Sequence, residues 1–195
     1  MDLIARWFAV RRVSLKITRA RSTKTGDFRP PRNGNLPVIT VNGSLNRYAF
    51  LITLVHEIAH YHRFETCESQ ITLFRKRREP PHGSKWKEEF RCQLAPFLTP
   101  SVFPEELLEV MKKHMKNPRA STYSDPLLAR VLMRFDPVKQ TVSVEEIPEG
   151  AGFVTPRGLH FRKEGKLRKR YRCICVTNRK TYLFSPLAQV IPSAP

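Results

Sequence analysis

An apolar segment in the first third of the chain constrains the fold more than any other feature. From Leu45 to about Arg63, large apolar side chains recur at alternating intervals of three and four residues, a spacing that gives a helix one buried face. Ser44 precedes the segment and is a good N-terminal cap. We therefore expect a helix here, and its buried face is made by Leu45, Tyr48, Ile52, Val55 and Ala59.

The same segment contains an HExxH motif, formed by His56, Glu57 and His60. Residues four apart lie one above the other on a helix, so the two imidazoles can reach one metal ion. The intervening glutamate lies beside them and can accept a proton from a metal-bound water. Small side chains, Ala49 and Thr53, precede the histidines on this face and leave room for a site. The motif predicts one catalytic zinc ion with Glu57 as general base.

A catalytic zinc site needs a third protein ligand and an open fourth position. His62 lies two residues beyond His60 and points about 200° away on a continuing helix, so it cannot join the pair. His82 lies at the start of a predicted helix, after two prolines that fix its direction, and Gly83 allows close backbone approach. His82 is therefore the strongest candidate, and the alternatives for a site with two histidines and a glutamate are Glu79, Glu88 and Glu89.

The remaining pattern predicts an α+β fold followed by a small β-rich segment. Two strands precede the HExxH helix, at 12–18 and 36–42, and Pro37 favours an edge position for the second. The intervening 26–34 is expected to be a loop, and the short N-terminus leaves little room for a helix. Further helices are predicted at 85–94, 104–115 and 126–135, and short strands at 141–147, 159–162, 170–177 and 180–184. We expect a domain over residues 1–137 and a small basic β-rich domain over residues 138–195.

The chain is strongly basic, with 35 Lys and Arg against 17 Asp and Glu and a net charge of +18. Residues 1–35 carry a net +7 and residues 141–195 a net +6, whereas residues 36–60 are neutral. A surplus of this size predicts a polyanionic partner, and nucleic acid is the default. The sequence has no signal-peptide pattern, no apolar stretch long enough to cross a membrane and four cysteines, which together predict a cytoplasmic protein.

Several segments around the motif resemble the SprT-like zinc metalloprotease domain, a family that includes the Spartan proteases acting on DNA–protein crosslinks. The resemblance covers roughly residues 13–95, and it rests on residues 24–29, 39–42, 45–51, 53–60 and 82–86. It implies a zincin-like fold, in which a small sheet packs on the HExxH helix, and hydrolysis of peptide bonds in DNA-bound proteins. It also implies that His56, His60 and His82 are the zinc ligands and Glu57 the general base. The strand at 36–42 would then hold an extended substrate by edge pairing.

The end of the chain departs from this family, in which many members carry a zinc ribbon with two cysteine pairs. Here the segment offers Cys173 and Cys175, on one side of a predicted strand, without a second pair nearby. We expect a small β-fold without a complete zinc ribbon. Its predicted core is Tyr171, Ile174, Val176, Tyr182 and Phe184.

Two basic stretches are candidate DNA contacts, because lysine and arginine bind phosphates without a strict motif. One stretch precedes His82 and comprises Arg75, Lys76, Arg77 and Arg78. The other comprises Arg162, Lys163, Lys166, Arg168, Lys169, Arg170 and Arg172, and Tyr171 within it could stack on a base. Two further function classes fit the sequence: a non-catalytic, zinc-containing DNA-binding module, and a metallohydrolase of small substrates.

Overall fold

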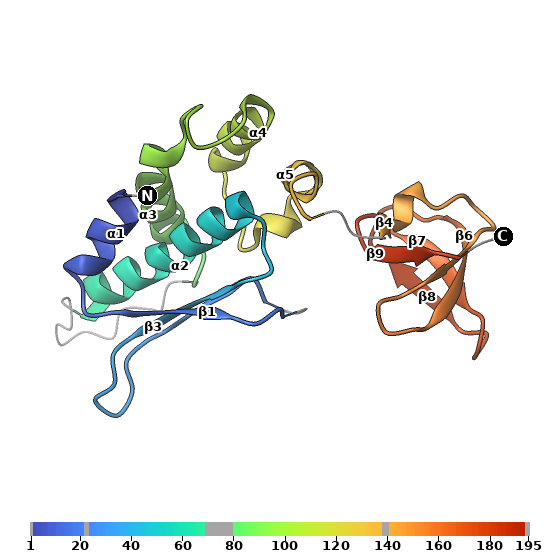
Figure 1. Cartoon of the computed structure of the whole chain (residues 1–195), viewed down its shortest axis with the longest axis horizontal. Coiled ribbons are helices and arrows are strands. Elements are labelled where there is room, and N and C mark those ends of the chain that lie inside the picture. The colour runs from blue at the N-terminus through green and yellow to red at the C-terminus, as the bar shows by residue number, and fades with distance from the viewer. Residues whose placement is uncertain (1, 22–23, 69–79, 138–140, 194–195) are drawn as a thin grey trace. The chain divides into compact units, whose positions relative to one another are not determined.

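A computed structural model describes residues 2–21, 24–68, 80–137 and 141–193. It divides the chain into two compact units, Met1–Asp136 and Pro137–Pro195 (Figure 1). The boundary expected from the sequence lies one residue away from this division. Within the described residues, the first unit has five α-helices and a three-stranded sheet and the second has a six-stranded sheet. The chain is therefore of mixed α+β class.

The first unit contains, in chain order, α1 (Asp2–Ala9), β1 (Ser14–Thr18), β2 (Gly26–Arg29), β3 (Val38–Asn42), α2 (Arg47–Glu68), α3 (Ser84–Leu94), α4 (Glu105–Met115) and α5 (Pro126–Met133), with short 3₁₀ helices at Ala95–Phe97 and Thr122–Ser124. Helix α1 occupies a segment for which no helix was predicted. It forms because Ile4, Trp7 and Phe8 give it an apolar side that packs against α2 and the sheet. None of the helices in the described ranges combines the length and the apolarity that a membrane span needs.

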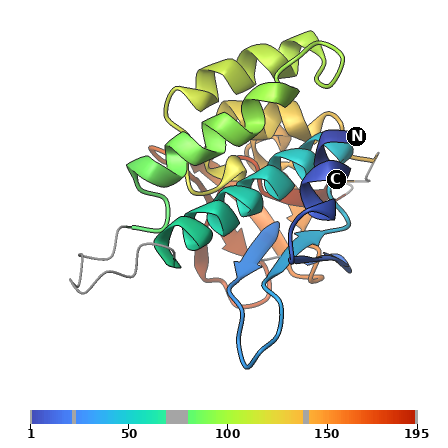
Figure 2. The same ribbon diagram turned by 90° about the vertical axis from the view of Figure 1, so that its left-hand side faces the viewer.

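Helix α2 lies between the sheet and the other long helices (Figures 1 and 2). One side of it belongs to the core formed with α3, α4 and α5, and it contains four of the five residues predicted to be buried, Tyr48, Ile52, Val55 and Ala59. The fifth, Leu45, precedes the helix and is partly buried against the same core. The opposite side packs Leu54, Ile58 and Tyr61 against Ile39 and Val41 of β3. A helix that is apolar on both sides must be covered on both sides, which makes α2 the centre of the unit.

The first turn of α2 is capped by Asn46 and not by Ser44 as predicted. The side-chain oxygen of Asn46 accepts hydrogen bonds from the backbone N–H groups of Tyr48 and Ala49, at 3.1 and 2.9 Å. The amide group of the same side chain donates to the Leu132 carbonyl and to Asp136. The cap therefore also ties the start of α2 to the end of α5.

The three-stranded sheet has the order β1-β3-β2, with β1 parallel and β2 antiparallel to β3. The prediction that Pro37 places the second strand at an edge is wrong, because β3 is the central strand. Pro37 lies just before β3, so the N–H group that proline lacks is not needed for a hydrogen bond between strands. Its carbonyl still accepts a hydrogen bond from the Ser14 N–H at 2.9 Å. Strand β2 was predicted to be a loop, since its sequence Gly-Asp-Phe-Arg has few of the residues that favour strands.

The second unit contains β4 (Val142–Ser143), a 3₁₀ helix at Val144–Glu146, β5 (Gly152–Val154), β6 (His160–Lys166), β7 (Tyr171–Cys175), β8 (Thr181–Phe184) and β9 (Gln189–Pro192). The strand order is β4-β9-β5-β6-β7-β8, and the neighbouring strands are antiparallel throughout. Strands β5 and β9 were not predicted, because each is a short run without clear alternation.

The core of this unit differs in part from the predicted one. Tyr171 is buried and Phe184 packs against the core, as predicted. Side chains alternate along β7, so Cys173 and Cys175 point inward with Tyr171 while Ile174 lies on the other face. The prediction that Ile174 belongs to the core is wrong for this reason. Val176 and Tyr182 were also predicted to be core residues, and this is wrong because both are among the exposed large side chains. The two cysteines are free thiols that fill the core.

Candidate metal centre

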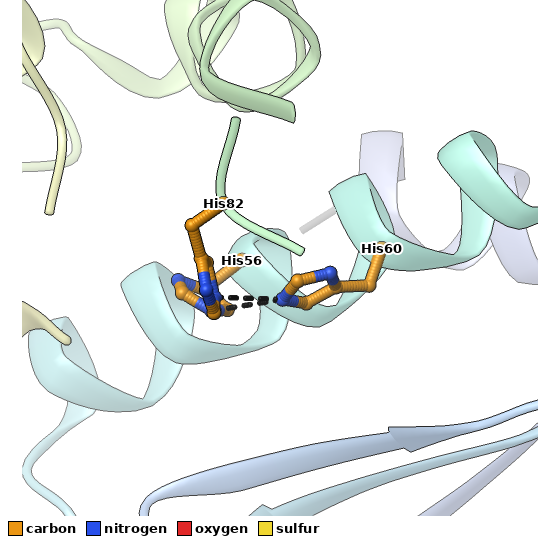
Figure 3. A group of neighbouring side chains, drawn as sticks. All are labelled: His56, His60 and His82. Atoms are coloured by element: carbon orange, nitrogen blue, oxygen red, sulfur yellow. Dashed lines mark hydrogen bonds between the residues drawn. The ribbon is translucent and has the colours of Figure 1, made fainter. Parts of the chain in front are cut away.

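Three histidines from two segments converge in the first unit (Figure 3). His56 and His60 lie on successive turns of α2, and His82 lies in the turn that precedes α3. That turn is closed by a hydrogen bond from the Gly83 N–H to the Pro80 carbonyl, at 2.9 Å. The Nε2 atom of His60 lies 3.3 Å from that of His56 and 3.0 Å from that of His82, and the Nε2 atoms of His56 and His82 are 3.2 Å apart.

These separations match what a tetrahedral metal ion requires. Zinc binds histidine nitrogens at about 2.0–2.1 Å, so two ligands at the tetrahedral angle lie about 3.3 Å apart. Three neutral imidazoles cannot each satisfy both neighbours by hydrogen bonds at Nε2, because that atom either carries a proton or accepts one. An ion at the centre would satisfy all three lone pairs. The cluster of His56, His60 and His82 could therefore hold a metal ion.

The glutamates that were alternatives for the third ligand are not part of this cluster. Glu88 forms an ion pair with Arg91 at 2.9 Å, and Glu89 accepts a hydrogen bond from Gln93 at 2.8 Å and lies 3.7 Å from His62. Glu79 lies outside the described residues. Among the residues that the structure describes, His82 is the third member of the group.

Burial keeps the three imidazoles neutral. It lowers the pKa of His56 well below the usual value, lowers that of His60 to about 4 and also lowers that of His82. The mutual repulsion of the charged forms acts in the same direction for His56 and His60. Because the neutral form is the one that binds a metal, the site needs no deprotonation step at neutral pH.

Trp86 packs against all three histidines. Its ring centroid lies 4.5 Å from that of His56, 5.3 Å from that of His60 and 4.6 Å from that of His82. The ring stacks on Phe90 on α3, and Trp86 is buried. The contact with the histidines was not predicted, although the four-residue spacing from His82 to Trp86 was a signal for it.

Glu57 is a buried carboxyl group next to the cluster. Burial, and to a smaller extent the nearby Asp27 carboxylate, raise its pKa to about 8, whereas a hydrogen bond from the backbone N–H of Phe28 acts in the opposite direction. The contact with Phe28 shows that Glu57 reaches from α2 to the edge of β2. A positive ion at the histidine cluster would favour the carboxylate form.

Strand β2 approaches Glu57 closely because residue 26 is glycine. A Cβ atom at Gly26 would lie 2.6 Å from Cγ2 of Thr53 and 2.7 Å from Oε1 of Glu57. No side chain fits between β2 and α2 at this point. The sequence analysis missed Gly26, and a glycine beside an aspartate in a presumed loop offered no signal for this contact.

His62 lies away from the cluster, as its position on the helix predicted. Its Nε2 accepts a hydrogen bond from the indole N–H of Trp7 at 2.9 Å, and its Nδ1 lies 3.7 Å from Glu89. The residue thus connects α1, α2 and α3. Its role in the first unit is to hold α1 against α2.

The candidate DNA contacts differ in their exposure. Arg75, Lys76, Arg77 and Arg78 lie outside the described residues. Lys163 is buried in the second unit, where its Nζ donates to the carbonyls of Val144, Glu145 and Ile147, so the prediction that it contacts DNA is wrong. Tyr171 is also buried, and the Lys163 ammonium group lies 4.0 Å from the centre of the tyrosine ring. The ring therefore cannot stack on a base. Arg162 is paired with Glu164, whereas the remaining five are exposed: Lys166, Arg168, Lys169, Arg170 and Arg172.

No family model, curated protein or solved structure matches this chain. Its fold and site define an α+β unit that carries a three-histidine cluster able to hold a metal ion. The function must therefore be inferred from the chemistry of that cluster and its surroundings.

Proposed function

We propose that the first unit is a zinc metallopeptidase of the SprT-like type, with a zincin-like fold. The observation that supports the proposal is that the three histidine Nε2 atoms lie within 3.3 Å of one another. Two of these histidines, His56 and His60, lie on α2 together with the buried Glu57. A structural zinc site uses four protein ligands and has no need of a neighbouring buried acid. Three ligands beside a candidate base favour catalysis.

In this proposal His56, His60 and His82 hold the zinc ion and Glu57 moves the proton. Bound zinc would polarise the scissile carbonyl and lower the pKa of a water molecule. Glu57 accepts the proton of the attacking water and passes it to the nitrogen of the leaving amine. The hydrogen bond from the Phe28 N–H favours the carboxylate form that accepts the proton.

The substrate would lie along β2. The expectation that the strand at 36–42 supplies this edge is wrong, because β3 is paired on both sides. The Asn42 N–H donates to the Thr25 carbonyl at 2.7 Å, and the register then turns the backbone groups of Gly26 and Phe28 outward. Glu57 already accepts from the Phe28 N–H, so an extended peptide would pair with the other outward backbone groups of this edge, next to Glu57.

The proposed substrates are DNA-bound proteins, since the second unit offers a basic hairpin for DNA. Three of the four residues that join β6 to β7, Arg168, Lys169 and Arg170, are basic and exposed, and Lys166 at the end of β6 adds a fourth exposed charge. Among the described residues, no carboxylate forms an ion pair with these four side chains. The charges are thus available to phosphates.

Cleavage of a DNA-binding protein tests the proposal. The zinc-loaded chain is expected to cut a histone-like substrate, faster when DNA is present, and Glu57→Gln is expected to abolish cutting while retaining zinc. Equal residual cleavage by the parent and by Glu57→Gln would refute the peptidase. Zinc and DNA binding without any cleavage would identify the chain as a non-catalytic module instead.

A further inference from the structure

The three-stranded sheet is covered by helices on one face only. Figures 1 and 2 show the helices of the first unit on the same side of the sheet as α2. Ile39 and Val41 of β3 point toward α2, so the alternate residues of β3 and their partners in the register point away from it. These outward positions are Ser14, Lys16, Thr18, Asp27, Arg29, Val38, Thr40 and Asn42. We call this surface the outer sheet face.

Positive charge is concentrated on and around the outer sheet face. Residues 12–32 contain seven basic side chains and one acidic one, Asp27. Asp27 is already neutralised by Lys24 at 3.2 Å and by Arg29 at 2.9 Å. Lys16 is exposed at the middle of β1. The face therefore presents a positive surplus, although Asp27 offsets part of the charge of Lys24 and Arg29.

Arg21 lies against this face with a donor that has no acceptor. Its Nη2 donates to the hydroxyl group of Thr40 at 3.3 Å, and its backbone carbonyl accepts from Asn42 at 2.8 Å. Its Nε is buried and has no hydrogen-bond partner among the described residues. Because this Nε is buried, an anionic oxygen at the face could reach the guanidinium group only through its terminal nitrogen atoms.

The outer sheet face and the candidate active site are separated by a single strand. Phe28 donates its N–H to Glu57, while the next residue, Arg29, points to the outer sheet face. An anionic polymer on this face would therefore pass one residue away from the proposed catalytic base. A protein attached to that polymer would lie close to the free edge of β2.

We infer that the outer sheet face binds the sugar–phosphate backbone of duplex DNA through Lys16, Arg21 and Arg29. The outward positions include no aromatic side chain, so this face contacts phosphates and does not stack on bases. The inference deepens the DNA association proposed above and rests on it. It assigns DNA binding to the catalytic unit itself, in addition to the hairpin of the second unit.

The test measures binding of a labelled 20-base-pair duplex by fluorescence anisotropy at several salt concentrations. The full chain carries Glu57→Gln, so that cleavage plays no part. The test variant combines Lys16→Gln, Arg21→Gln and Arg29→Gln. The matched control removes the same number of charges at the end of α4 and directly after it, through Lys112→Gln, Lys113→Gln and Lys116→Gln. Loss of three phosphate contacts should reduce the slope of log affinity against log salt by about 2.7 and weaken binding at 0.1 M salt by about tenfold or more.

Each other outcome contradicts the inference in a distinguishable way. If the parent binds the duplex and both triple variants retain the same slope, the outer sheet face is not the contact, although the DNA association stands. If the parent does not bind the duplex, the DNA association itself fails, whereas the peptidase proposal is unaffected. If polyglutamate competes as well as the duplex does, the face is a general anion surface. Arg21→Lys, which keeps the charge, should retain most of the slope and controls for a folding defect.

Discussion

Replacing Gly26 by alanine would place a methyl carbon in the narrow space between β2 and α2. The new Cβ would lie 2.6 Å from Cγ2 of Thr53 and 2.9 Å from Cγ of Glu57. Two carbon atoms need about 3.5 Å or more, so the shortfall toward Thr53 is about 0.9 Å. The Thr53 side chain is branched at Cβ and cannot easily turn aside. Either β2 retreats by about 1 Å or Glu57 swings away from the site.

The expected result is a loss of activity with little loss of metal binding. A misplacement of about 1 Å at a catalytic group can cost about 10²-fold in rate, and overpacking of this kind costs about 1–3 kcal/mol in the free energy of unfolding. The three histidines do not contact Gly26, so zinc affinity should remain. The assays are kcat/KM on a peptide substrate, zinc content after gel filtration and denaturant unfolding.

Two further variants separate the causes. Gly165→Ala is the matched control, because its Cβ would meet nothing nearer than 3.8 Å, and it should leave all three measurements unchanged. Adding Thr53→Ser to Gly26→Ala removes the nearest methyl group and should restore part of the stability, but not the position of Glu57. A Gly26→Ala chain with kcat/KM within twofold of the parent and unchanged stability would refute the reasoning.

Three other predictions follow from the same contacts. In metal-free protein, the free energy of unfolding attributable to Glu57 should fall by about 1.4 kcal/mol per pH unit between pH 4.5 and 8, because the folded form, with a pKa of about 8, holds a proton that the unfolded chain has lost. Glutamine resembles the protonated side chain, so urea unfolding of the parent and of Glu57→Gln should differ more at pH 8 than at pH 5, and a constant difference contradicts the prediction. Co²⁺ should quench the fluorescence of Trp86 in a chain carrying Trp7→Phe, and His82→Ala should weaken that titration at least about tenfold; quenching at unchanged concentration would remove His82 from the site. Lys163→Met should destabilise the second unit by about 2 kcal/mol or more without changing DNA affinity, and weaker DNA binding by the folded variant would contradict its structural role.

Two of the three histidines in the cluster were predictable as neighbours because their arrangement is local. The positions of His56 and His60 follow from helix geometry, since residues four apart share a face wherever the helix lies. His82 was favoured by its place after two prolines, and the cluster includes it. The identity of the metal and the reaction remain predictions.

The surroundings of the cluster were not predictable, because they depend on long-range pairing. Strand β2 exists by virtue of its pairing with β3, and its four residues have little preference for a strand. The burial of Lys163 depends on the 3₁₀ helix whose carbonyls it bonds. Lys163 lies two residues after the buried Phe161 on β6, and this spacing indicated that both side chains point inward. The run of basic residues around Lys163 suggested an exposed surface instead.

The sequence by itself determined a helix that carries two histidines and a glutamate on one side, because the repeat of the helix converts residue spacing directly into direction. It also determined where the basic charge lies along the chain. Only the tertiary structure decided that His82 meets those histidines, that β2 reaches Glu57, and that basic residues line the uncovered face of the sheet. Those three outcomes join residues far apart along the chain, whose distances in space are set by packing and strand register rather than by local propensity.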